Sequence, residues 1–385
     1  MAKTKATASA TPKKDRLAII EELAAEVNSK LGGNFLLKGS ETRQDVPHTS
    51  TGILSFDLAL GGGYAANQWN EIVGEESSGK TALAYQMVAA NMERDPEYLA
   101  LWVAAEEYVP EYAQSFGIDP ERIWVVESNE MEKVLDLVLK AVVNRAVDCV
   151  VIDSLPALVT NTEVAKNMDE ASVATGAQIL SRFFKKCTMA QRRSMLAGEA
   201  DRPCTLIAIN QWRDKIGVMF GDPRTTPGGK AKNYYFFTRM EVRRDEWIQE
   251  QKSNLDSRVG QTIKMRVIKN KTYRPQQMAQ VDFFFADSDV FGMKMGQFDT
   301  VKDIVNVALA LELFEGRYKF EGERIAGNKE ELYDAVRQDV GLQRKLIDAA
   351  HKAMQFDTAP VSFVEPSEEP TLEEFVEDFE DVLDA

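Results

Sequence analysis

Residues 74–81 read Gly74-Glu75-Glu76-Ser77-Ser78-Gly79-Lys80-Thr81, which matches the phosphate-binding pattern G-x-x-x-x-G-K-[ST]. An apolar, strand-like run from Trp69 to Val73 precedes them, and a helix-like run from Ala82 to Glu93 follows. The motif requires this context, because backbone N–H groups at a helix N-terminus then surround phosphate oxygens. Lys80 would bridge the outer phosphates and Thr81 would hold Mg²⁺. A glycine turn that only opens a helix is the weaker alternative, so the sequence predicts a site for a nucleoside triphosphate.

The composition is ordinary for a globular protein, with 44% hydrophobic residues in a chain of 385. No apolar run reaches roughly 18 residues, and the N-terminus lacks the apolar region of a signal peptide, so we expect neither a membrane span nor secretion. The cysteines Cys149, Cys187 and Cys204 are far apart and form no C-x-x-C pair, which argues against a zinc ribbon or a disulfide framework. A reduced, cytoplasmic location is therefore expected. His48 and His351 lie away from every motif, so histidine chemistry is not expected.

The charge is unevenly distributed along the chain. The formal net charge is −15, but residues 356–385 contain eleven acidic and no basic side chains, so the rest carries −4. Residues 182–244 hold fourteen Lys or Arg against five Asp or Glu. A basic middle with an acidic tail is typical of nucleic-acid contact tuned by a competing anion. A solvated surface plus a disordered tail explains the charges equally well, so charge alone leaves both open.

Residues 50 to about 290 alternate strand-like and helix-like runs, which predicts an α/β doubly wound core with a mainly parallel sheet. Continuous apolar runs at Leu99–Val103, Cys149–Ile152 and Thr205–Ile209 fit parallel strands that are buried on both faces. Helical patterns separate them at Met131–Val143 and Gly176–Lys186. After Gly229, antiparallel strands are expected to extend the sheet, at Tyr234–Val242, Thr262–Lys269 and Val281–Phe285.

Four segments are expected along the chain. Residues 1–48 hold a basic stretch and an amphipathic helix at Leu17–Val27, residues 49–290 form the core, residues 291–355 form a small α-rich domain, and residues 356–385 form an acidic disordered tail. In the small domain we expect helices at Val301–Leu313 and Glu330–Met354, with a short hairpin at Arg317–Ile325 between them. The apolar stripe of the first helix must be buried, either on a neighbouring subunit or on its own core.

Acidic side chains follow two of the predicted strands. Asp153 ends the run Cys149–Ile152 and is placed to hold the Mg²⁺ shell across from Thr81. Glu106 follows the strand that ends near Ala105, where a glutamate can polarise the water that attacks the γ-phosphate. Glu107 is adjacent, and spacing alone does not choose between the two glutamates.

A third strand leads into an unusual loop. Gln211 closes the run Thr205–Asn210, where an amide can report the γ-phosphate to the loop that follows. That loop, Trp212–Lys230, mixes basic residues, glycines and exposed apolar side chains, which suits a segment that orders on a nucleic-acid backbone. Lys269 and Lys271 end an antiparallel strand. From the residues alone, two surface lysines are the simpler interpretation, and fingers that act on a neighbour's γ-phosphate are the alternative.

Together these segments resemble the RecA family of bacterial and viral DNA recombinases, from about Leu17 to Met354. The most specific matches are Ser50–Gly61, the loop Gly74–Thr81, Asp148–Leu155 and Ile209–Gly221. The run Gly316–Gly322, the lysine pair and the acidic tail match as well. Among the departures, Glu75 replaces a proline, Asn233 stands where the family often has an interface lysine, and Thr188–Asp201 is longer than the family pattern.

The resemblance implies that ATP and Mg²⁺ lie between adjacent subunits of a helical filament. The cofactor-binding residues would be Gly74, Glu75, Glu76, Ser77, Ser78, Gly79, Lys80, Thr81, Tyr112 and Asp153, with Thr81 and Asp153 at the metal and Tyr112 near the adenine. The catalytic residues would be Glu106, Lys80, Gln211, Lys269 and Lys271. The resemblance therefore selects Glu106 over Glu107, and it reverses the simpler interpretation of the two lysines.

The resemblance also implies two DNA loops, at about Glu163–Ala171 and Trp212–Lys230. The DNA-binding residues would be Val173, Arg213, Lys215, Ile216, Gly228, Gly229 and Lys230. The implied partners are single-stranded and double-stranded DNA, further copies of this chain, and single-strand binding and loading proteins. The first helix would dock on a neighbouring subunit, and the tail would restrain access to duplex DNA. The implied location is the bacterial nucleoid, or the host cytoplasm for a viral member.

The expected function is therefore an ATP-dependent recombinase that pairs and exchanges homologous strands in DNA repair and the response to DNA damage. A hexameric helicase or remodeller with the same core is the first alternative, and closed rings on DNA would reveal it. A scaffold that binds ATP without hydrolysing it is the second. A small-molecule kinase is weaker, because it leaves the basic loop without a task.

Overall fold

The computed structural model describes residues 16–31, 35–41, 46–167, 175–196, 202–214, 224–229, 232–252 and 255–354. The helices are α1 Arg16–Leu31, η1 Gly39–Glu41, α2 Leu54–Leu60, α3 Lys80–Arg94, α4 Pro110–Ser115, α5 Met131–Val143, η2 Leu155–Ala157, α6 Asn161–Val164, α7 Thr175–Leu196, α8 Lys232–Tyr235, α9 Thr300–Ala310, α10 Lys329–Gln338 and α11 Val340–Ala353. The strands are β1 His48–Thr49, β2 Tyr64–Ala65, β3 Trp69–Gly74, β4 Ala100–Ala104, β5 Ile123–Val126, β6 Cys149–Asp153, β7 Thr205–Gln211, β8 Arg213–Asp214, β9 Arg224–Thr225, β10 Thr238–Lys252, β11 Leu255–Asn270, β12 Met278–Phe284, β13 Lys319–Phe320 and β14 Glu323–Arg324.

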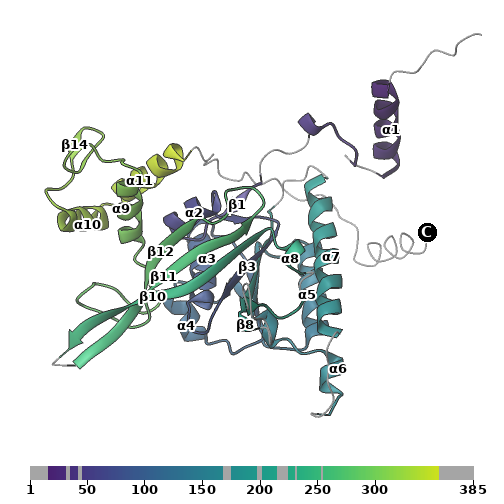
Figure 1. Ribbon diagram of the computed structural model, residues 1–385, viewed down its shortest axis with the longest axis horizontal. Helices are drawn as coiled ribbons and strands as arrows, with labels where there is room; N and C mark the ends of the chain where they lie inside the picture. Colours follow the sequence, from purple (N-terminus) through teal and green to yellow (C-terminus); the bar gives the residue numbers. More distant parts are fainter. Residues whose placement is uncertain are drawn as a thin grey trace, which may run out of the picture.

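A central sheet organises the described chain, with eight strands in the order β12-β11-β10-β3-β7-β6-β4-β5 (Figure 1). The strands from β10 to β5 are parallel neighbours, whereas β11 and β12 are added antiparallel. The predicted fold class, an α/β core with a mainly parallel sheet that antiparallel strands extend, is confirmed. Because β3, β7, β6 and β4 are parallel, their carboxyl ends meet at one edge of the sheet, where such folds bind ligands.

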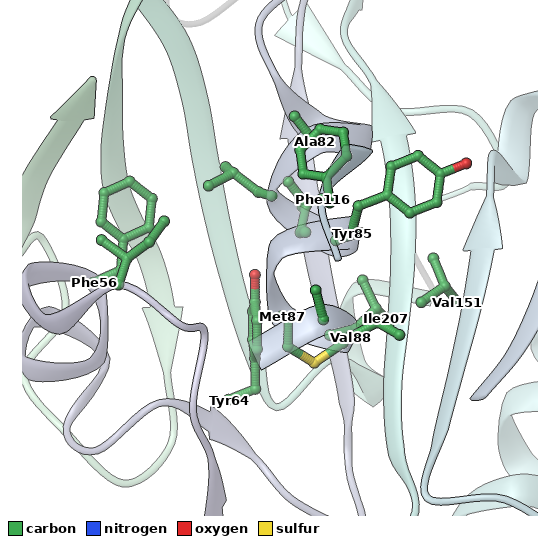
Figure 2. Packing of buried hydrophobic residues seen from close by; sticks show 14 of the residues in the cluster. Phe56, Tyr64, Ala82, Tyr85, Met87, Val88, Phe116, Val151 and Ile207 are labelled. Carbon is green, nitrogen blue, oxygen red and sulfur yellow. The ribbon is translucent and has the colours of Figure 1, made fainter. Parts of the chain in front are cut away.

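Two hydrophobic clusters cover the two faces of the sheet. Alternate residues of β6 point to opposite faces, so Val151 packs in the cluster around α3, whereas Val150 packs in the cluster around α5 and α7. Figure 2 shows the first cluster, in which Tyr85 and Val88 of α3 face Val151 and Ile207 of the sheet. Burial on both faces explains why these strands are apolar throughout.

A third cluster lies beyond β12 and joins α9, α10 and α11 to the core. Leu332, Val336 and Leu346 are buried there, together with Leu54 and Leu58 of α2. The expected hairpin near 317–325 is present as β13 and β14. By contrast, α1 has no buried residue and stands away from the sheet (Figure 1). Its apolar stripe includes Leu17, Ile20 and Leu23, each about half exposed.

The described chain corrects two expectations. The run Tyr234–Val242 is not one strand, because residues 232–235 form the short helix α8 and the strand begins only at Thr238. The helix expected at Glu330–Met354 is two helices that break at Asp339, whose backbone is extended and whose carboxylate caps the second by accepting from Leu342 N–H. At Asp339 a local cap thus prevails over an apolar pattern that suits one longer helix.

Several predicted elements are longer than the pattern indicated. The strand expected at Thr262–Lys269 spans Leu255–Asn270, and with β10 it forms a hairpin that projects beyond the sheet (Figure 1). The helix expected at Gly176–Lys186 continues to Leu196, so it takes up much of the segment 188–201 that exceeds the family pattern. The acidic tail at 356–385 and the basic stretch at 1–15 lie outside the described residues.

Candidate nucleotide site and its coupling to a basic loop

Residues 74–81 form a tight turn between β3 and α3, at the carboxyl edge of the sheet. A Cβ atom on Gly74 would stand 2.4 Å from the Val242 carbonyl oxygen, and one on Gly79 would stand 2.2 Å from Ile263 Cδ1. Gly79 also has a φ of +92°, which favours glycine. Both glycines are therefore required for close packing, and the turn leaves the N-terminus of α3 facing the space above the sheet edge. This backbone cradle fits phosphate oxygens.

Lys80 is the first residue of α3 and is largely buried, with 8% of its surface exposed. Its ammonium donates a hydrogen bond to the Glu75 carbonyl oxygen over 2.5 Å. Burial lowers the pKa of Lys80, while the carboxylates of Asp153 and Glu106 oppose that shift. The ammonium is thus held at the loop, among carboxylates, in the position where an outer phosphate would replace the carbonyl as its partner.

Thr81 and Asp153 bring two oxygen donors together. Thr81 Oγ1 donates to Asp153 Oδ2 over 2.8 Å. Burial raises the pKa of Asp153 to about 6, and Glu106 adds to the shift, whereas the Thr81 hydrogen bond and Lys80 oppose it. A hydroxyl and a carboxylate are the hard donors that Mg²⁺ uses when substrate phosphates and waters complete its shell. Within the described residues, no cluster of three or more His, Cys, Asp or Glu forms a further metal site. The donors present therefore fit Mg²⁺ bound together with a nucleotide.

Glu106 lies beside this pair, just after β4. Its Oε1 accepts a 2.6 Å hydrogen bond from Ser154 Oγ, and its backbone N–H donates to the Asp153 carbonyl oxygen over 3.2 Å. Glu106 is thus fixed at the sheet edge by the residue that follows Asp153. Sequence reasoning missed Ser154, although a hydroxyl next to a strand-end aspartate was a visible signal.

An aromatic cluster borders the site on the α3 side. Tyr85 stacks on Trp102 with ring centroids 4.2 Å apart, and Tyr112 and Tyr108 contact its edge at 6.1 and 6.4 Å. Tyr112 is half-buried on α4, against Phe116. The predicted adenine-side residue therefore belongs to a packed group rather than to a loose loop. Spacing in the sequence did not reveal Tyr85 or Tyr108 as its partners.

Gln211 ends β7 directly beside the phosphate loop. The register of β3 and β7 pairs Gly74 with Gln211. The next residues form a two-stranded stem, in which Arg213 pairs with Thr225 and Asp214 with Arg224. Residues 212–214 and 224–229 are called the loop stem below. Of the predicted DNA-binding residues, Arg213, Gly228 and Gly229 lie in this stem, whereas Val173, Lys215, Ile216 and Lys230 lie outside the described residues.

The residue before Gln211 belongs to a buried hydrogen-bond network of polar side chains. Asn210 donates to Glu71 Oε1 over 2.8 Å, and Arg239 Nε donates to Glu71 Oε2 over 2.5 Å. Glu71 is fully buried, so its charge requires these donors. This hydrogen-bond network links β7, β3 and β10 at the point where the loop stem begins. No local pattern predicts these hydrogen bonds, because three separate segments contribute one residue each.

Lys269 and Lys271 lie far from the phosphate loop of their own chain. Lys269 Nζ donates to the Asn233 carbonyl oxygen over 2.7 Å, and Lys271 Nζ donates to that of Tyr234 over 3.4 Å. Burial lowers the pKa of Lys269 to about 8, and the charges of Lys271 and Arg239 add to the shift. Both ammonium groups therefore contact backbone carbonyl oxygens of α8, which is a single helical turn.

Comparison with known proteins agrees with this geometry. The family model of the RecA N-terminal domain matches residues 18–289. The chain belongs to the RecA family. Protein RecA of Lactococcus lactis subsp. cremoris strain MG1363 is 34% identical over 321 residues, which cover 83% of this chain and 75% of that protein.

Two further RecA proteins show that the similarity extends over nearly the whole RecA chain. Protein RecA of Halalkalibacterium halodurans is 29% identical over 364 residues, which cover 90% of this chain and 99% of that protein. Protein RecA of Synechocystis is 32% identical over 319 residues, which cover 82% and 84%. A recombinase function follows from membership of the RecA family, and the helicase alternative is not favoured. No helix in the described part of the chain is long and apolar enough to cross a membrane.

Proposed function

We propose that this RecA-family chain is a DNA-dependent ATPase that polymerises on single-stranded DNA and exchanges homologous strands, with ATP bound between neighbouring copies. The observation that carries the proposal is the separation of two cationic groups on one sheet. Lys80 lies at the carboxyl edge, whereas Lys269 and Lys271 lie toward the opposite edge. One chain therefore offers half of a phosphate site on each side, which suits a head-to-tail assembly.

The strand register gives the size of this separation. Lys269 pairs with Arg239, and Arg239 pairs with Glu71, which is three residues before Gly74 on β3. Three residues of a strand span about 10 Å, and two strand spacings add to this distance. The Lys269 ammonium also points toward α8 rather than toward the loop. The two lysines are thus suited to the nucleotide of a neighbouring copy, where they would stabilise charge in the transition state.

Within one chain, the phosphate loop would bind and orient the nucleotide. Backbone N–H groups at the start of α3 would hold the phosphates, and Lys80 would exchange the Glu75 carbonyl for an outer phosphate oxygen. Thr81 and Asp153 would hold Mg²⁺, which supplies charge neutralisation on the phosphates when bound. Tyr112 would limit the space available to the base.

Glu106 would orient and deprotonate the attacking water. It is fixed by Ser154 and lies near Asp153, so a water between it and the γ-phosphate would be held in line. Gln211 would sense the same phosphate from β7, because its register partner is Gly74. The loop stem follows Gln211 directly. A shift of Gln211 on binding or loss of the γ-phosphate would therefore move the first residue of the stem. This is the kind of order–disorder coupling that nucleotide switches use.

The test measures ATP hydrolysis with and without single-stranded DNA and images the same samples by electron microscopy. DNA-stimulated turnover together with open helical filaments is the expected result. Strand exchange between a circular single strand and a homologous linear duplex then checks the recombinase step, and it should require ATP. Closed rings, or turnover indifferent to DNA, would overturn the proposal.

A further inference from the structure

Lys232 is a buried lysine that the nucleotide site does not use. It begins α8, and only 1% of its surface is exposed. An ammonium in such a place loses its hydration, which costs free energy unless hydrogen bonds and opposite charge offset the loss. The contacts of Lys232 therefore indicate what it is retained to hold.

The ammonium of Lys232 contacts the loop stem. It donates to Thr226 Oγ1 over 2.5 Å, and a second hydrogen bond of 3.1 Å reaches Asn233 Oδ1. Thr226 is itself buried, directly after β9. The chain then turns closely around the aliphatic part of the lysine: a Cβ on Gly228 would stand 3.2 Å from Lys232 Cδ. The C-terminal side of the stem is thus held by one buried cation.

Electrostatic interactions connect Lys232 with the buried hydrogen-bond network of Asn210, Glu71 and Arg239. Burial lowers the pKa of Lys232 to about 8, the Glu71 carboxylate opposes that shift, and Arg239 adds to it. Glu71 also accepts from Asn210, the residue before Gln211. The Glu71 carboxylate therefore attracts Lys232 electrostatically and also accepts a hydrogen bond from the residue before Gln211.

A second set of contacts, made by Arg224 at the start of the C-terminal side, holds the stem to β10 and to Trp212 of the N-terminal side. Arg224 forms an ion pair with Glu241 of β10, and its guanidinium stacks over the Trp212 ring at 4.8 Å. Glu241 also pairs with Arg266 of β11 over 2.6 Å. These groups are more exposed than Lys232, so solvent weakens them more. Of the two sets of contacts, those of Lys232 are the less exposed to solvent. Their strength therefore depends more strongly on the positions of the donor and acceptor atoms.

We propose that Lys232 is a positioning residue for the DNA response: its hydrogen bond to Thr226 sets the conformation of the loop stem and links the stem, through Glu71 and Asn210, to Gln211. The inference rests on the proposed function, because it assumes that the loop at 212–230 contacts DNA. Without this hydrogen bond the stem has to be ordered by DNA itself, so more DNA is needed for the same response.

The experiment compares Lys232→Leu, Thr226→Val and the double variant with the unmodified chain. Lys133→Leu serves as a control for the loss of a lysine charge, because Lys133 is exposed on α5 and pairs with Glu130 of its own helix end. For each variant, ATP hydrolysis is titrated with oligo(dT), which gives the half-saturating DNA concentration and the turnover at saturation. Each single variant should raise the half-saturating concentration about tenfold, as expected for one hydrogen bond to a charged group. Saturating turnover should fall much less.

The double variant separates positioning from general packing. If the two side chains act through their shared hydrogen bond, the double variant resembles either single variant instead of multiplying their effects. Independent, multiplied effects would overturn the inference, and so would a Thr226→Val variant that matches the unmodified chain. Thermal unfolding of each variant is measured first, because removing one partner of a buried ammonium contact leaves the other partner unpaired and destabilises the fold. Should Lys232→Leu not fold, Thr226→Val alone decides. An unmodified chain whose turnover ignores DNA overturns the proposed function instead.

Discussion

Thr81 and Asp153 meet across the carboxyl edge of the sheet, where the threonine hydroxyl donates to the carboxylate over 2.8 Å. They are 72 residues apart in the sequence and belong to α3 and to β6. The contact places two oxygen donors side by side, which reduces the reorganisation that binding of Mg²⁺ and a nucleotide would require. Glu106 reaches the same place through Ser154.

Replacing Glu106 by glutamine should lower ATP turnover about 100-fold or more, because it removes the general base while keeping the shape. Nucleotide affinity should change little, since Glu106 is not expected to hold the phosphates. Turnover is measured by phosphate release and affinity by a fluorescent ATP analogue. Glu107→Gln is the matched control and should retain nearly full turnover. Equal losses in the two variants would contradict the assignment of Glu106.

Mixing two inactive variants tests whether the site is shared. Lys80→Ala disables the phosphate loop, and the paired change Lys269→Ala with Lys271→Ala disables the opposite side. In a random equal mixture with head-to-tail contacts, about one subunit interface in four joins an intact phosphate loop to an intact lysine pair of the neighbouring subunit. DNA-dependent turnover should therefore recover to about a quarter of the unmodified value. A mixture as inactive as its components would refute the assignment of the lysine pair to a neighbour's nucleotide.

The lowered pKa of Lys269, about 8, predicts a pH limit on activity. Its ammonium loses its proton as the pH rises through that value, so its attraction for a phosphate is present below pH 8 and lost above it. The ratio kcat/KM for ATP, which reports the groups of the free enzyme, should fall on the alkaline side. Lys269→Arg should abolish this fall, because a guanidinium stays charged. An identical alkaline limb in that variant would assign the limb to another group.

Asp303 predicts a stability effect that is separate from the nucleotide site. Burial raises its pKa to about 6, and its carboxylate accepts a 3.0 Å hydrogen bond from Ser55 N–H. Because the folded pKa lies above the unfolded value near 3.9, the folded state binds the proton more tightly. Its contribution to the free energy of unfolding is therefore largest below about pH 4. It declines by on the order of 2–3 kcal/mol as the pH rises to about 6.

Asp303→Asn removes this titration and keeps the acceptor oxygen. The variant should be more stable than the unmodified chain at pH 8, and the difference should shrink toward pH 5. Urea unfolding at the two pH values gives both free energies, and the difference between proteins cancels the other carboxylates. A difference that is the same at pH 5 and pH 8 would show that Asp303 does not titrate as described.

Local patterns carried much of the fold. The helix at Met131–Val143 has the predicted bounds, because its apolar residues Val134, Val138 and Val142 recur at helical spacing and face the core. The parallel strands could also be recognised, because strands that are buried on both faces are continuous runs of apolar residues. By contrast, α8 and the break at Asp339 depend on a cap or on contacts with distant residues.

What the sequence determined by itself was the phosphate loop, the order of strands and helices, and the identity of the strand-end side chains Asp153 and Gln211. Glycine spacing and apolar periodicity are local, so they survive without the fold. The tertiary structure alone decided that Ser154 fixes Glu106, that Glu71 joins three strands, and that Lys232 holds the loop stem. Each of these contacts joins residues whose separation in the chain is set by sheet order and register, and no local pattern records that pairing.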